Sequence, residues 1–156
     1  GDVPRGLAPS RPLAPSSVVY AGLREMDAPE EAAIRRMGMV ALPPAALRED
    51  GYASLTGGLR LTGCSRLHIH LDLDVLDPLE FPHVSVPSPG GLGIDELKQL
   101  LQAVGSALPL AGLTVTEARP LDAPGEAAVL AALLELLGPA GLDVASRLGG
   151  VAPSST

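Results

Sequence analysis

The stretch of sequence that decides the fold is Leu67-His68-Ile69-His70-Leu71-Asp72-Leu73-Asp74-Val75-Leu76-Asp77-Pro78. Side chains of a β-strand point alternately to its two faces. A strand over residues 66–75 therefore has one apolar face and one face that carries His68, His70, Asp72 and Asp74. Burying four such groups is costly unless they are paired or bind a cation, and imidazole and carboxylate groups are common ligands of divalent metals. The pattern favours a metal site; the alternative is an edge strand whose polar face lies in water.

Short apolar runs and amphipathic segments alternate on both sides of this stretch. Strands are predicted at 17–23, 39–42 and 110–116, helices at 29–37, 94–108 and 124–137, a short helix with a glycine-rich turn at 43–59, and a proline-rich loop at 78–91. Strands that alternate with helices are typical of an α/β fold around a mostly parallel sheet. Such sheets bind ligands beyond the carboxyl ends of their strands, where Asp72 and Asp74 are expected.

Composition limits the class of protein. The 156 residues suit a single domain, and a hydrophobic content of 46% allows a real core. A formal net charge of -7 argues against a nucleic-acid surface, and no apolar run approaches the roughly 20 residues of a membrane span. The single cysteine, Cys64, excludes an intrachain disulfide framework. We expect a soluble, cytoplasmic protein with no nucleic-acid or membrane partner, an irregular lead-in at 1–17 and a flexible tail at 138–156.

Three motifs occur in a fixed order around the central stretch. Upstream of Asp72–Pro78 lies Gly22-Leu23-Arg24-Glu25-Met26-Asp27-Ala28-Pro29-Glu30. Shortly downstream lies Val86-Pro87-Ser88-Pro89-Gly90-Gly91-Leu92. Further downstream lies Glu117-Ala118-Arg119-Pro120-Leu121-Asp122. Together they resemble the C-terminal half of the ureohydrolases, the family of arginases and agmatinases. The His-x-His-x-Asp-His motif of metallo-β-lactamase-like hydrolases is a poorer match, because position 73 is Leu.

The resemblance implies a three-layer α/β/α fold of the arginase type over residues 18–137, truncated on its N-terminal side. It implies hydrolysis of a guanidino C–N bond of arginine or a related compound by a hydroxide that bridges two Mn²⁺ ions. By position, Asp72 resembles the carboxylate that bridges both metals, and Asp74 resembles a ligand of one. Glu117 resembles the residue that receives the substrate's guanidinium. Asp27 resembles a contact of the substrate's α-amino group, which Glu30 supports; from the residues alone, both could equally cap a helix.

The chain also departs from the family pattern. His70 stands where the family usually has Ser, and we expect it to support the metal site from outside the ligand set or to pack, rather than to bind metal directly. The family's remaining metal ligands lie N-terminal to all the motifs found here. We therefore expect a partial enzyme that is inactive alone. The resemblance also implies a homo-oligomer when full length. The alternative is a non-catalytic fold remnant that serves as a binding or structural module.

Overall fold

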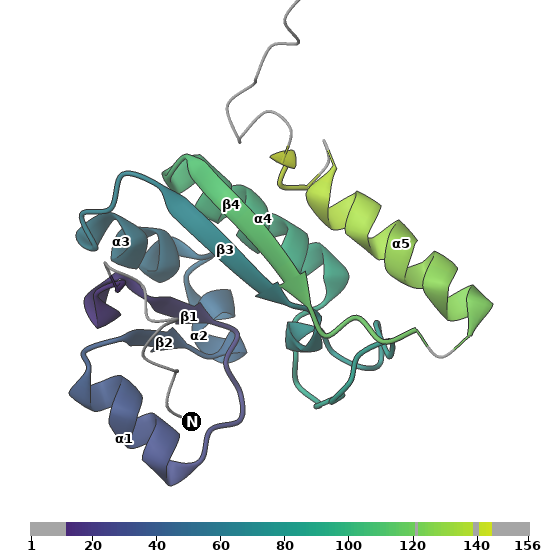
Figure 1. Ribbon diagram of the computed structural model, residues 1–156, viewed down its shortest axis with the longest axis horizontal. Coiled ribbons are helices and arrows are strands. Elements are labelled where there is room, and N and C mark those ends of the chain that lie inside the picture. Colours follow the sequence, from purple (N-terminus) through teal and green to yellow (C-terminus); the bar gives the residue numbers. More distant parts are fainter. Residues whose placement is uncertain (1–11, 121, 139–140, 145–156) are drawn as a thin grey trace, which may run out of the picture.

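A computed structural model describes residues 12–120, 122–138 and 141–144 (Figure 1). Its elements are β1 (Val19–Ala21), α1 (Ala28–Arg36), β2 (Val40–Leu42), α2 (Pro44–Glu49), α3 (Ala53–Leu61), β3 (Leu67–Asp72), α4 (Ile94–Ala107), β4 (Leu110–Thr116) and α5 (Ala123–Leu137), with 3-10 turns at Pro15–Ser17 and Leu73–Val75. Residues 1–11 of the predicted lead-in and 145–156 of the predicted tail lie outside the described residues.

All strand pairs within the named strands are parallel. In the described part of the chain, β1 pairs with β2 and β3 pairs with β4, each as a two-stranded sheet. Parallel neighbours need a crossover connection, which α1 provides for the first pair and α4 for the second. The predicted α/β class with parallel strands is therefore confirmed. The register of the second pair places Asp72 opposite Thr116, so both strands end at the same level.

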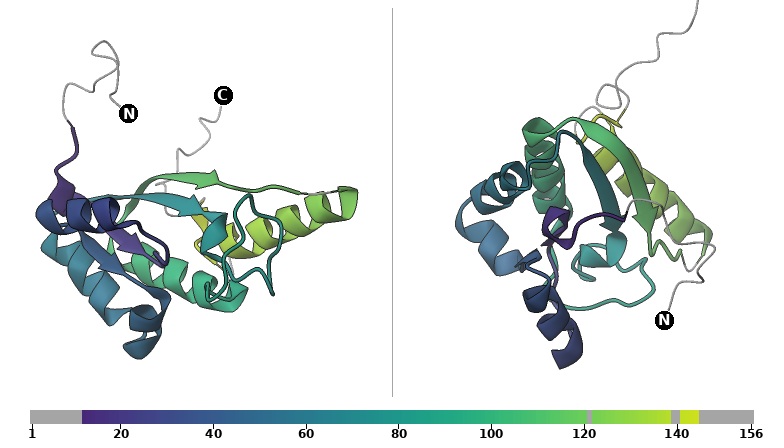
Figure 2. Two further views of the ribbon diagram at one scale, coloured as in Figure 1. Left: turned by 90° about the horizontal axis from the view of Figure 1, so that it is seen from below. Right: turned by 60° about the vertical axis from the view of Figure 1, so that its left-hand side comes forward.

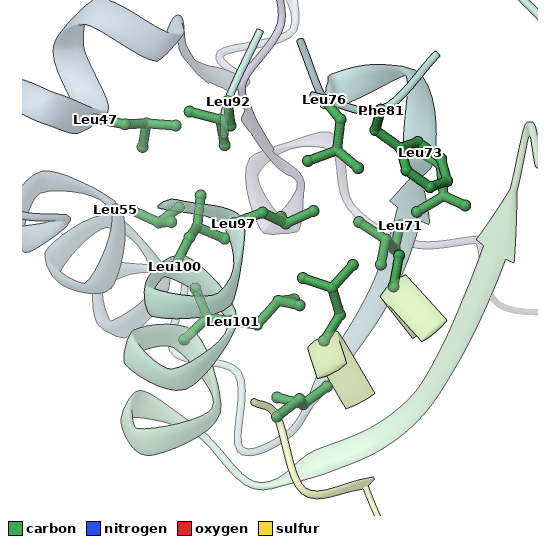
Figure 3. Packing of buried hydrophobic residues seen from close by; sticks show 14 of the residues in the cluster. Leu47, Leu55, Leu71, Leu73, Leu76, Phe81, Leu92, Leu97, Leu100 and Leu101 are labelled. Atoms are coloured by element: carbon green, nitrogen blue, oxygen red, sulfur yellow. The ribbon is translucent and has the colours of Figure 1, made fainter. Parts of the chain in front are cut away.

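The two faces of the β3–β4 sheet differ completely. Helices α4 and α5 lie on one face (Figure 2), and leucines of α4 gather there with leucines of β3 and the following turn (Figure 3). On the opposite face, which no described helix covers, His68 and His70 are exposed. Their Nε2 atoms lie 3.1 Å from Thr114 Oγ1 and 3.3 Å from Thr116 Oγ1, respectively. Of the three predicted layers, the described residues thus build the sheet and one helical layer at β3–β4.

The sequence explains where the main helices begin. Asp27 Oδ1 accepts a hydrogen bond from Glu30 N at 2.8 Å and Glu30 Oε2 accepts one from Asp27 N at 3.0 Å, a capping box at the start of α1. Asp122 caps α5 by accepting a bond from Gly125 N at 2.7 Å. Along α4 the buried residues follow helical spacing, as predicted: Leu97, Leu100, Leu101 and Val104.

Three sequence-based boundaries are wrong. The strand predicted at 66–75 ends at Asp72, because the Asp72 carboxylate accepts a hydrogen bond from Asp74 N at 3.1 Å and starts a 3-10 turn. Asp74 therefore does not belong to the alternating face of β3. Gly57 and Gly58 lie inside α3 instead of forming a turn. The tail does not begin at Gly138, since Leu142 is fully buried and its N–H donates to Leu136 O at 2.8 Å.

In the described ranges, every helix is too short or too polar to cross a membrane.

Candidate active site at the carboxyl ends of the strands

The turn that follows β3 is anchored by two leucines and presents two carboxylates. Leu73 and Leu76 are both fully buried in the core. Asp72 and Asp74 are only partly buried, and the bond from Asp74 N to Asp72 Oδ1 holds them on the same tight turn. Since parallel sheets bind ligands beyond the carboxyl ends of their strands, the turn lies where a site is expected.

The surroundings of Asp74 disfavour its charged form. Loss of solvation raises the pKa of this carboxyl, and the neighbouring Asp72 carboxylate raises it further. The Arg24 guanidinium acts in the opposite direction, and Glu117 adds a smaller repulsion. Acidic groups from two strand ends therefore both act on Asp74. A cation bound between them would relieve this repulsion.

Glu117 begins directly after β4 in a strained backbone conformation. Its φ is 64°, in the left-handed region that a residue with a side chain rarely adopts. The segment after it is fixed by an antiparallel bridge between Val84 and Ala118 and by a hydrogen bond of 2.9 Å from Arg119 N to His83 O. The proline-rich loop thus holds Glu117 in place. Strain of this kind is typical of functional positions.

His83 on this loop is half-buried. Its ring packs edge-on against Phe81, with ring centroids 5.7 Å apart. Its Nδ1 is buried and has no hydrogen-bond partner among the described residues. The histidine therefore belongs to the packing of the loop that supports Glu117.

The glycine pair of the second motif lets the chain run directly along the carboxylate turn. Leu92 N donates to Val75 O at 2.9 Å and Asp77 N donates to Leu92 O at 2.8 Å. A Cβ atom on Gly91 would lie 2.5 Å from Leu76 C and 2.6 Å from both Asp77 N and Val75 O, so only glycine fits. The motif therefore serves backbone packing.

Asp77 fixes the second half of the turn. Its Oδ1 accepts a hydrogen bond from Leu79 N at 2.9 Å and its Oδ2 accepts one from Gly90 N at 2.8 Å. These backbone donors hold the pKa of the Asp77 carboxyl below its ordinary value, Leu79 most strongly. Both carboxylate oxygens of Asp77 thus hold backbone N–H groups, which makes Asp77 a structural residue of the turn.

The segment that leaves β1 lines an open hollow of about 550 Å³, whose lining comprises Arg24, Glu25, Met26, Asp27 and Glu30. Asp27 and Glu30 form the capping box of α1, so the helix-cap interpretation of these residues is confirmed. Ser88 Oγ donates to Glu25 Oε1 at 2.5 Å and connects this segment with the proline-rich loop. The hollow thus lies beside the loop that follows the carboxylate turn.

Arg24 was overlooked as a site residue in the sequence. Its guanidinium donates to Asp74 O at 2.6 Å and to Val75 O at 3.0 Å. The only signal in the sequence was an arginine two residues after Gly22, the buried glycine that follows β1.

Comparison with known proteins identifies the family. A model of the Arginase family matches residues 4–137. The chain belongs to the arginase family. It is 34% identical over 103 residues to the N(1)-aminopropylagmatine ureohydrolase of Thermus thermophilus, covering 66% of this chain and 34% of that protein. It is 30% identical over 139 residues to the N(omega)-hydroxy-L-arginine amidinohydrolase of Streptomyces lavendulae, and the match covers 86% of this chain and 47% of that protein.

Solved structures agree with this assignment. The arginase of Helicobacter pylori superimposes with a TM-score of 0.69 at 29% identity, covering 78% of this chain and 42% of the arginase. The predicted ureohydrolase resemblance and arginase-like fold are therefore confirmed. The chain spans about a third to a half of the length of the relatives it matches.

The donor set fits part of a metal site. Asp72 and Asp74 offer carboxylate oxygens, which manganese accepts as ligands. The pKa of Asp74 is raised first by loss of solvation and then by the adjacent Asp72 carboxylate, and a bound cation would offset both effects. Within the described ranges, however, no three His, Cys, Asp or Glu side chains are grouped closely enough to hold a metal ion. In this arginase-family chain, His68 and His70 contact threonines across the sheet.

Proposed function

We propose that this chain supplies one side of the active site of a manganese-dependent amidinohydrolase, which hydrolyses a guanidino C–N bond of arginine or a related compound. The observation that carries the proposal is the placement of Asp72, Asp74 and Glu117 just after or at the carboxyl ends of two paired parallel strands, where Asp72 and Glu117 both raise the pKa of Asp74. Membership of the arginase family supports the reaction class.

Each acidic residue has a separate role in this proposal. Asp72 would contact both of two Mn²⁺ ions and Asp74 would contact one of them. Bound manganese would supply a Lewis acid that lowers the pKa of a water molecule. Glu117 would pair with the planar guanidinium of the substrate, because a carboxylate can accept two of its N–H donors at once. The strained backbone of Glu117 is consistent with a side chain aimed at a substrate.

The substrate's far end would lie in the hollow lined by the segment after β1. Asp27 and Glu30 are the proposed contacts of its α-amino group. Each keeps part of its carboxylate engaged in the capping box, so the helix start orients both groups before a substrate binds. Glu25, bonded to Ser88, adds a third acidic group at this hollow. This charge favours a substrate that carries a cationic amine.

We propose, as the family resemblance implies, that this chain needs further ligands to be active and that the whole enzyme is a homo-oligomer. Among the described residues, Asp72 and Asp74 are not joined by a third ligand. The same observation favours a second candidate: a fold remnant that binds partners without catalysis. Tight Mn²⁺ binding that depends on Asp72 separates the two.

The test combines metal binding with activity. We expect calorimetry to detect Mn²⁺ binding to the chain, weakened at least about tenfold in Asp72→Asn and Asp74→Asn. Asp50→Asn, in the turn before α3, is the matched control. The full-length protein that contains these residues should release urea, or the corresponding amidino product, from arginine, hydroxyarginine or agmatine only with manganese. Absence of manganese-dependent turnover on all three compounds would refute the amidinohydrolase proposal.

A further inference from the structure

We infer that Arg24 is a positioning residue: it holds the turn that carries Asp72 and Asp74 and ties this turn to the segment that lines the hollow. This inference rests on the proposed function. The hydrogen bonds of Arg24, the close approach of Gly22 and the hollow beside them carry it.

The guanidinium of Arg24 reaches across the fold to one short piece of backbone. Its two terminal nitrogens donate to the carbonyl oxygens of Asp74 and Val75, at 2.6 and 3.0 Å. These carbonyls belong to consecutive residues, so the planar fork fixes the orientation of both peptide groups. Val75 O also accepts the bond from Leu92 N. Arg24 therefore joins three segments of the chain at the carboxylate turn.

The backbone conformation at Gly22 brings Arg24 close to the carboxylate turn. Gly22 has a φ of +85°, and a Cβ atom there would lie 2.4 Å from Val75 Cγ2. Gly22 N donates to Leu42 O at 2.8 Å, which anchors the segment to β2. The backbone that leaves β1 consequently lies directly against the turn after β3, and the next side chains begin the lining of the hollow.

Arg24 supplies positive charge without occupying the carboxylates. It lowers the pKa of Asp74 electrostatically, yet it forms no ion pair with Asp72 or Asp74 in the described structure. Its terminal donors are directed at backbone carbonyls. The carboxylate oxygens that a metal ion would need are left accessible, and a displacement of the segment after β1 would be transmitted to the turn.

The test uses Arg24→Gln, which removes the charge, and Arg24→Lys, which keeps the charge but not the fork. Two controls accompany them. Arg35→Gln removes an exposed arginine that pairs with Glu31, and Leu136→Ala weakens the core on α5. Amide hydrogen exchange of residues 73–77 is measured in the metal-free chain, and Mn²⁺ affinity is measured by electron paramagnetic resonance of the free ion.

We expect Arg24→Gln to speed exchange in the turn and to weaken Mn²⁺ binding, each by about tenfold, since both charge-assisted bonds are lost. Arg24→Lys should show a smaller increase in exchange and a smaller loss of Mn²⁺ affinity. Added guanidinium ion should partly restore Mn²⁺ affinity to an Arg24→Ala chain. Arg35→Gln should change neither readout. Leu136→Ala should lower thermal stability without changing metal affinity, which separates positioning from general destabilisation.

Unchanged exchange and unchanged Mn²⁺ affinity in Arg24→Gln would overturn the inference while leaving the proposed function intact. If Arg24→Gln does not fold, Arg24→Lys decides: affinity equal to wild type overturns the inference. If the wild-type chain binds no Mn²⁺, the metal part of the proposed function fails, and the exchange data still decide whether Arg24 holds the turn.

Discussion

Asp74 and Asp77 lie three residues apart on either side of Leu76, and their surroundings act on them in opposite directions. The first half of the turn after β3 raises the pKa of Asp74 through burial and the adjacent Asp72 carboxylate. The second half lowers the pKa of Asp77, because backbone N–H groups of Leu79 and Gly90 donate to its two oxygens. The same residue type therefore stabilises the fold at one position and is disfavoured at the other.

The opposite pKa shifts distinguish Asp77, a structural residue, from Asp74, a candidate site residue. Both oxygens of Asp77 are used by the protein's own backbone, so this residue has little left to offer a ligand. The Asp74 carboxylate faces loss of solvation and the adjacent Asp72 carboxylate, whereas the Asp74 backbone carbonyl accepts a hydrogen bond from Arg24. A charged group that the fold disfavours is a candidate for function.

The largest expected effect on stability comes from Gly91→Ala, which disrupts the backbone packing in the second half of the turn. The added Cβ would collide with backbone atoms of Val75, Leu76 and Asp77, which cannot move away as a flexible side chain could. We expect a loss of about 3 kcal/mol in the free energy of unfolding, at the upper end for overpacking. Chemical denaturation measures it.

Gly58→Ala is the matched control for this substitution. Gly58 lies inside α3 and a Cβ there meets nothing within 4 Å. Alanine is the better helix former, so we expect this variant to gain up to about 1 kcal/mol. A tolerated Gly91→Ala chain would show that the segment 90–92 does not pack against the turn as described.

A smaller loss is expected for Asp77→Ala, which leaves the N–H groups of Leu79 and Gly90 without their carboxylate acceptor. The pKa of Asp77 is lowered in the fold, so its contribution is complete above the ordinary aspartate pKa of about 3.9 and is lost as the pH falls through the lowered value. The difference in melting temperature between wild type and variant should therefore shrink below about pH 4. A difference that stays constant down to pH 2 would contradict the assignment of this effect to ionised Asp77.

Much of this fold follows from local sequence rules. Three local signals in the sequence are found in the structure where they were expected: the helical spacing of apolar residues in α4, the strand over Leu110–Thr116 and the capping residue Asp27. The end of β3 was misplaced for a physical reason. Strict alternation predicts a strand through Val75, but the Asp72 side chain competes for the backbone N–H of Asp74 and turns the chain.

The candidate site is less accessible to sequence reasoning, because its connections are long-range. The acidic residues were found through motifs, and their roles remain predictions. Arg24 contacts backbone carbonyls 50 and 51 residues away, and carbonyls carry no sequence signature. The positive φ of Glu117 likewise has no signal in the sequence, because it follows from how the loop holds the chain and not from a local preference of glutamate. Family motifs thus predict the candidate site residues, whereas the contacts that hold these residues are visible only in the structure.

The smallest expected effect has the opposite sign: Asp74→Asn should stabilise the metal-free chain. Burial and Asp72 raise the pKa of Asp74, so the fold bears a penalty for its charge at neutral pH. Because the group is only partly buried, solvent screening limits the gain to a few tenths of a kcal/mol. The gain should be complete at pH 7 and should disappear as the pH falls through the raised pKa toward the ordinary value, where the wild-type carboxyl becomes neutral as well. Thermal unfolding in the presence of a chelator, at pH 7 and at pH 4, measures this trend beside that of Asp77→Ala. A destabilised Asp74→Asn chain at pH 7 would place Asp74 with the scaffold, and the contrast between the two halves of the turn would be lost.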